Sequence, residues 1–203
     1  MVVISDETYD KLILDDDLQH VSIAALNPEL PVVTVNGLSK SYLVPGFRLG
    51  WGIVSGEGNL VNDYIETIYK LLRIRLSANH AEQYAVKPAL EGDQTHLIEV
   101  RAKLKRRRDI TVDRLNSITG MSCTKPSGAF YAFPKVDIDE RDDAFVRELI
   151  RETGVVVVPG NSFGERPNTH HFRLVFLPKE DILNAAFDRI EEFMDGYRQR
   201  RAR

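Results

Sequence analysis

Apolar residues form three short runs early in the chain, at residues 2–5, 32–36 and 50–54. Each run is rich in β-branched residues and ends in polar residues or glycine, which is typical of β-strands. Because the runs are apolar on both faces, they favour buried strands of a parallel or mixed sheet that helices cover.

Helical spacing follows these runs. Between residues 58 and 76 the apolar side chains recur three and four positions apart, which predicts a helix packed along one face. A second helical stretch is expected at about 79–90, and a long charged one at 95–118 suits a connector between domains. Further strands are expected near 122–124, 129–134, 155–158 and 171–176, with helices near 142–153 and 179–200.

This order of elements predicts an α/β protein with two parts. Residues 1–95 would supply a partial mixed sheet with its helices. Residues 96–203 would form a small α/β domain led by the long connecting helix.

The composition is that of an ordinary globular protein, with 43% hydrophobic and 28% charged residues in a chain of 203. A net charge of −3 provides no field that attracts nucleic acid or an anionic membrane, so small molecules or other subunits are the expected partners. No apolar run reaches the roughly 20 residues that cross a bilayer, and no secretion signal is visible. The single cysteine, Cys123, cannot form an internal disulfide, and we expect a cytoplasmic protein.

Candidate chemistry concentrates between residues 36 and 51, where a turn between two apolar runs carries Lys40 and Arg48. A lysine in a partly desolvated site near other cations becomes available as a neutral nucleophile. The arginine can present a planar fork to a phosphate, and Ser39 can add a hydroxyl donor. The alternative is a solvated loop lysine with an arginine in a surface ion pair.

Two further segments place charged residues beside apolar runs. Asp6 and Tyr9 follow the first run, at the end of a strand where ligands bind in open α/β sheets, although Asp6 could also cap a helix. Arg173 lies in the apolar run 171–176, where an unpaired charge would be costly, so an anion is expected beside it. An acidic residue of the chain is one candidate for that anion.

Together these segments resemble the fold-type I aminotransferases of class I and II, which depend on pyridoxal 5'-phosphate (PLP). The resemblance covers essentially the whole chain and implies a role for each residue. Lys40 would hold the cofactor as a Schiff base and move the substrate proton. Asp6, as a buried aspartate, would pair with the pyridinium nitrogen, and Tyr9 would donate to the phenolic oxygen. Ser39 and Arg48 would bind the phosphate, and Arg173 would clamp the substrate α-carboxylate.

Within the family, the chain is most similar to the alanine (glutamate–pyruvate) aminotransferases in residues 4–12, 36–40 and 75–79. Many aminotransferases have a serine where this chain has Gly37, and the alanine subgroup shares that departure. Segments 125–134 and 155–164 resemble the family's small domain, in which Gly128 and Gly160 would permit a close backbone approach or a positive φ.

The resemblance implies the C-terminal half of such an enzyme, with residues 1–95 as the C-terminal portion of the large PLP-binding domain and residues 96–203 as the small domain. The implied reaction is transamination between an amino acid, alanine or glutamate, and a 2-oxo acid. The implied partner is a second copy in a homodimer or a missing N-terminal half. The alternative is a non-catalytic fragment that folds or dimerises without productive cofactor binding.

No metal site is expected. The adjacent His170 and His171 would face opposite ways on a strand, and the other histidines lack ligand spacing. The basic cluster Arg106–Arg108 is interpreted as the solvated face of a helix, since it has no stacking aromatic residues for nucleic acid.

Overall fold

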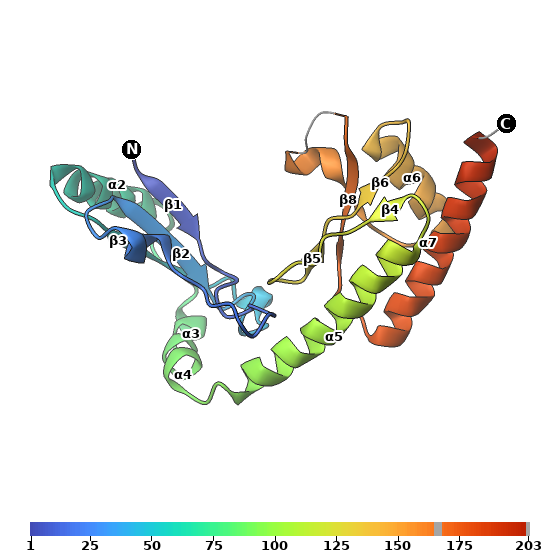
Figure 1. The fold of residues 1–203 in the computed structure, drawn as a ribbon. Helices are drawn as coiled ribbons and strands as arrows, with labels where there is room; N and C mark the ends of the chain where they lie inside the picture. Colours follow the sequence, from blue (N-terminus) through green and yellow to red (C-terminus); the bar gives the residue numbers. More distant parts are fainter. Residues whose placement is uncertain (165–167, 202–203) are drawn as a thin grey trace. The chain divides into compact units, whose positions relative to one another are not determined.

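The structure is a computed structural model that describes residues 1–164 and 168–201, without the side chains of residues 59, 60 and 201. It divides into two compact units, Met1–Arg101 and Ala102–Arg203, and the division falls inside helix α5 (Thr95–Ser117). Each unit has its own sheet and its own helices (Figure 1).

The first unit is built on a sheet in the order β1-β2-β3 (Figure 1). Strand β1 (Val3–Asp6) runs parallel to β2 (Val32–Gly37), and β2 runs antiparallel to β3 (Gly50–Ser55). The strands coincide with the three apolar runs of the sequence. The predicted mixed sheet is therefore confirmed.

The helices of the first unit are α1 (Ile23–Leu26), the 3-10 helix η1 (Pro45–Phe47), α2 (Asn59–Arg75), α3 (His80–Gln83), α4 (Val86–Glu91) and the start of α5. The single helix expected at about 79–90 is broken into α3 and α4. Pro88 explains the break, because it has no N–H to donate to the carbonyl of Tyr84, four residues earlier.

Gly37 and Gly50 are cross-strand partners at the end of the β2–β3 ladder. A Cβ atom on Gly37 would lie 2.7 Å from the carbonyl oxygen of Leu49, and one on Gly50 would lie 2.7 Å from that of Asn36. Only glycine fits this close approach. A serine at position 37 would meet the same backbone, immediately before the loop that carries Lys40.

The second unit contains an antiparallel sheet in the order β4-β6-β8-β5 (Figure 1). Strand β7 also pairs with β8. The strands are β4 (Met121–Ser122), β5 (Tyr131–Ala132), β6 (Lys135–Val136), β7 (Val158–Pro159) and β8 (His170–Val175), and the helices are α6 (Asp142–Thr153), the 3-10 helix η2 (Gly160–Phe163) and α7 (Glu180–Arg201). The strand expected at 129–134 is shorter in the structure, where β5 ends at Ala132. Pro134, which cannot donate to the ladder, separates it from β6.

Strand β8 divides the second unit into a core face and an outer face. Phe172, Leu174 and, just beyond the strand, Phe176 are buried and alternate with residues that face away from the core. On the core side they meet apolar residues of α6 and α7 such as Phe145, whose ring lies 6.4 Å from that of Phe172. The alternation places Arg173 on the outer face of the sheet.

Candidate functional site

The predicted cofactor residues of the first unit gather at one edge of its sheet. Because β1 and β2 run parallel, their carboxyl ends meet at the same edge. Asp6 is the last residue of β1, and the loop that follows β2 carries Ser39 and Lys40. The Nζ atom of Lys40 lies 5.9 Å from the centre of the Tyr9 ring. The structure thus brings an amine and a phenol together beside a carboxylate-bearing strand end.

Asp6 fixes the turn that leads to Tyr9. Its Oδ1 accepts hydrogen bonds from the backbone N–H of Thr8 at 3.2 Å and from the Thr8 hydroxyl at 2.6 Å. The residues after Asp6 form turns and no helix, so Asp6 is not a helix cap. The side chain is exposed, whereas a buried aspartate was expected. The strand ends at this residue, and the turn bonded to its carboxylate follows directly.

Glu7 is the buried carboxylate of this segment, and sequence reasoning did not assign it a role. Its Oε1 accepts hydrogen bonds from the hydroxyls of Ser5 at 2.9 Å and Ser22 at 2.8 Å, and from the backbone N–H of Ile23 at 3.3 Å. Its Oε2 lies 3.0 Å from Nε2 of His20. Burial alone would raise the pKa of Glu7, but these hydrogen bonds, His20 first, hold it below its ordinary value of 4.5.

We expect Glu7→Gln to lower the free energy of unfolding by about 2 kcal/mol at neutral pH, because the amide cannot accept all of these hydrogen bonds. The depressed pKa means that the unfolded chain takes up a proton at higher pH than the folded chain does. The stabilisation is therefore fully present above pH 4.5 and is lost as pH falls through the lower folded pKa. Urea unfolding of both proteins at descending pH should show the difference shrinking in acid.

The exposed Glu57, which also belongs to the first unit, provides the control. Glu57→Gln is expected to change the free energy of unfolding by less than about 0.5 kcal/mol. A Glu7→Gln protein as stable as wild type at pH 7, or a difference that does not depend on pH, would contradict the assignment.

The loop that carries Lys40 is tied to the start of α5. The hydroxyl of Tyr42 donates to Oε1 of Gln94 at 3.2 Å, and the Tyr42 ring lies 5.6 Å from the His96 ring. Burial, with a contribution from the charge of Asp10, raises the pKa of Tyr42. Ser41 is 1% exposed, and its hydroxyl has no hydrogen-bond partner within the described residues. The two contacts of Tyr42 thus connect the loop to residues 94–96.

Arg48 ends η1 in the left-handed conformation, with φ 53°. Its side chain is exposed, and Nη1 donates to the carbonyl oxygen of Pro45 at 2.7 Å. Ser39 is half-buried next to Lys40. The structure places both residues in the same loop as Lys40, and no surface ion pair involves Arg48 among the residues described.

Arg173 belongs to the second unit, where it pairs with Val158 of β7. Arg173 lies on the outer face of β8 and is half-buried, so its burial does not require an anion beside it, contrary to the expectation from the sequence. Within residues 1–164 and 168–201 no carboxylate lies at ion-pairing distance from its guanidinium. Among these residues, the alternative of a salt bridge to an acidic residue of the chain is therefore excluded. Its Cζ atom lies instead 4.7 Å from the centre of the Tyr131 ring and 4.0 Å from the centre of the Phe163 ring.

The two adjacent histidines face opposite ways on β8, as expected. Nδ1 of His170 lies 2.8 Å from Oδ1 of Asp142, a fully buried carboxylate at the start of α6. The His171 ring stacks on that of Phe133 with 4.8 Å between centres. In the described part of the chain, no three His, Cys, Asp or Glu residues gather as a metal site, and no helix has both the length and the apolar character to cross a bilayer.

Arg108 departs from the expected solvated face of α5. Arg106 is mostly exposed, but Arg108 is completely buried. Its Nε donates to Oδ1 of Asp109 at 2.9 Å and its Nη1 to the carbonyl oxygen of Pro126 at 3.1 Å. Asp109 also pairs with Lys125 at 3.1 Å. The buried Arg108 thus fixes the start of segment 125–134. The sequence of the basic cluster Arg106–Arg108 does not indicate this role.

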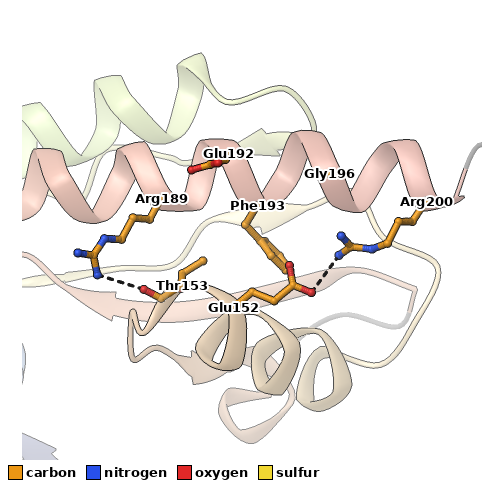
Figure 2. Close-up of a pocket in the computed structure, with 7 residues that line it drawn as sticks. All are labelled: Glu152, Thr153, Arg189, Glu192, Phe193, Gly196 and Arg200. Carbon is orange, nitrogen blue, oxygen red and sulfur yellow. Dashed lines mark hydrogen bonds and ion pairs between the residues drawn. The ribbon is translucent and has the colours of Figure 1, made fainter.

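The second unit also has a pocket of about 490 Å³ between α6 and α7 (Figure 2). Its arginines are already engaged, because Arg189 donates to the carbonyl oxygen of Thr153 at 3.2 Å and Arg200 pairs with Glu148 at 2.7 Å and Glu152 at 3.4 Å. None of the predicted site residues lines this pocket. We assign no function to it.

Comparison with known proteins gives a consistent result. The family model for aminotransferase class I and II matches residues 1–190. The chain is 40% identical over 206 aligned positions to the alanine aminotransferase of Mycobacterium tuberculosis, and 38% identical over 205 to the glutamate–pyruvate aminotransferase of Escherichia coli. The alignments cover 98% of this chain but 47% and 50% of those relatives.

Solved structures agree with the sequence matches. The alanine aminotransferase of Pyrococcus furiosus superimposes with a TM-score of 0.91 at 42% identity, over 97% of this chain and 50% of that one. An aspartate aminotransferase of Rhizobium meliloti superimposes with a TM-score of 0.82 at 30% identity. The chain therefore spans about half the length of the relatives it matches.

Proposed function

Because this chain belongs to the class I and II aminotransferases, we propose that it takes part in PLP-dependent transamination between an amino acid and a 2-oxo acid. The family and the α/β fold class expected from the sequence are confirmed. The observation that carries the proposal is the shared sheet edge, where the parallel pairing of β1 with β2 gathers Asp6, Tyr9 and Lys40.

The chemistry of this edge fits PLP. When bound, the cofactor withdraws electrons from the substrate α-carbon. Lys40 would attach the cofactor through Nζ and then carry the proton released at the α-carbon, while the Tyr9 hydroxyl would donate to the phenolic oxygen. Asp6 would keep the ring nitrogen protonated, since it is the last residue of β1, at the edge of the sheet where the loop with Lys40 begins. Ser39 and Arg48 would bind the phosphate.

Residues 1–95 are proposed to be the C-terminal portion of the large PLP-binding domain, and residues 96–203 the small domain. The compact units divide at Arg101, within the connecting helix α5. In the second unit, Arg173 would bind the substrate α-carboxylate with a bidentate fork. This role is supported by the absence of a carboxylate partner for Arg173 among the described residues.

Alanine or glutamate is the proposed amino donor, with the corresponding 2-oxo acid as acceptor, because relatives at 38–40% identity carry these substrates in their names. A homodimer, or association with a separate N-terminal half, is supported by the apolar side chains that the first unit exposes on and near α2. These are Leu71, Leu72, Ile74, Leu76 and Tyr84. Light scattering measures the assembly. We also propose a cytoplasmic location, which a single free cysteine suits.

The function is tested by adding PLP to the purified protein and recording the visible spectrum. A covalently bound cofactor should give a visible band that alanine removes and 2-oxoglutarate restores, and steady-state rates should follow ping-pong kinetics. The rival proposal is a non-catalytic fragment that folds or dimerises without productive cofactor binding. Failure to form any band would support that rival over the enzyme.

A further inference from the structure

The outer face of β8 carries a row of aromatic rings with Arg173 among them. We call this set the aromatic row and define it as Tyr131, Phe133, Phe163 and His171. Phe133 stacks on His171 and meets Phe163 edge-on at 6.1 Å between ring centres. The ring centres of Phe163 and Tyr131 lie 4.0 and 4.7 Å from Cζ of the Arg173 guanidinium. The aromatic row therefore contacts the positively charged guanidinium of Arg173.

The sheet register explains why Tyr131 reaches Arg173. Tyr131 of β5 pairs with Val175 of β8, and Arg173 lies two residues from Val175 on the same face. Diagonal neighbours of this kind are within reach of aromatic and long side chains. The contact is thus set by the backbone ladder.

Phe163 approaches Arg173 from the other direction, on the short helix η2. A Cβ atom on Gly160, the first residue of η2, would lie 2.5 Å from the carbonyl oxygen of His171 and 2.6 Å from its Cβ. Gly160 therefore allows η2 to lie directly against β8. Three residues later the same helix places the Phe163 ring over the guanidinium.

A guanidinium stacks on aromatic rings through its flat face, so its N–H groups remain directed outward in the plane. A carboxylate binds in that plane through two parallel hydrogen bonds. Ring contacts and carboxylate binding therefore do not compete. The rings restrict the rotation of a long, flexible side chain, and less entropy is lost when an anion binds.

We propose that Tyr131 and Phe163 are positioning residues that hold the Arg173 guanidinium with its N–H edge presented to a carboxylate. This inference rests on the proposed role of Arg173 in binding the substrate α-carboxylate. It adds that affinity for the carboxylate depends on two side chains that do not bond to it.

The test uses the chain with ¹⁵N-labelled arginine and follows the Nε–Hε signal of Arg173, assigned with Arg173→Lys, during titration with sodium glutarate at constant ionic strength. Glutarate is a carboxylate probe that cannot react. Tyr131→Leu and Phe163→Leu should each weaken the binding about two- to fivefold. The matched variants Tyr131→Phe and Phe163→Tyr keep a ring face and should retain the wild-type affinity. The ring-current shift of the free protein's signal should be lost only in the leucine variants.

The outcomes distinguish the positioning role of Tyr131 and Phe163 from the carboxylate-binding role of Arg173. If glutarate shifts the wild-type signal and the leucine variants bind it as tightly as wild type does, the positioning role is refuted while the carboxylate role of Arg173 stands. If glutarate does not move the wild-type signal, the carboxylate role fails, and the positioning role fails with it. If the phenylalanine and tyrosine exchanges weaken binding as much as leucine does, the ring face is not the cause.

Discussion

Lys40→Ala is expected to abolish covalent attachment of PLP and to lower the rate of transamination by about 10⁴-fold or more, the largest effect that any single change in this chain should have. The size of the effect follows from the two tasks proposed for one amine. Nζ of Lys40 would anchor the cofactor and would also carry the substrate proton, and alanine can do neither. Within the first unit, that Nζ lies over the ring of Tyr9 at 5.9 Å.

The measurement is the visible spectrum during titration with PLP, together with the rate of keto acid formation from alanine. Lys70→Ala, an exposed lysine on α2, is the matched control and should behave as wild type. Lys40→Arg retains the positive charge without a nucleophilic amine, so it should lose the band as completely as alanine does. A visible band of unchanged position and intensity in Lys40→Ala would show that another amine holds the cofactor.

The sheet and most helices of the first unit could be predicted from the sequence because local patterns encode them. Strands β1, β2 and β3 are short β-branched runs, and α2 follows its three- and four-residue apolar spacing. The break between α3 and α4 was missed although its cause, Pro88, is visible in the sequence. The apolar spacing of residues 79–90 continues across the break, whereas the backbone hydrogen bonding does not.

Charged residues show where sequence reasoning ends. The sequence predicts Arg108 to be one of several solvated arginines. In the structure Arg108 is buried and bonded to Pro126, because α5 packs the side that carries Arg108 into the second unit. Arg173 reads as a buried charge, yet the alternation of β8 places it on the outer face. Glu7 holds a loop more than ten residues away, and no local pattern marks that contact. All three depend on tertiary packing.

The resemblance implies the candidate cofactor residues, and the structure shows how the segments around Asp6 and Lys40 meet. That Asp6 and Lys40 lie at one edge follows from the parallel pairing of β1 with β2, in which Asp6 is opposite Val35. Strand direction cannot be read from an apolar run. The sequence also does not predict the turn after Asp6. Because the hydrogen bonds of this turn need only an acceptor oxygen, the charge of Asp6 can be removed without removing the turn.

Asp6→Asn is expected to lower kcat by about 10²–10³-fold while leaving covalent PLP attachment by Lys40 in place. Asparagine has nearly the same shape, and its amide oxygen can still accept the hydrogen bonds that Oδ1 of Asp6 receives from Thr8. The substitution therefore keeps the turn and removes the charge. Without that negative charge the ring nitrogen would lose its proton, and the cofactor would be a weaker electron sink.

Three measurements distinguish this electronic role from a structural one. The thermal unfolding temperature should stay near wild type, the visible band should still form, and kcat should fall much more than KM rises. Asp63→Asn, a change of the same kind on the exposed face of α2, should leave all three unchanged. If Asp6→Asn retained kcat within about twofold, the carboxylate would not control the ring nitrogen. The exposed Asp6 would then only stabilise the turn through its hydrogen bond to Thr8.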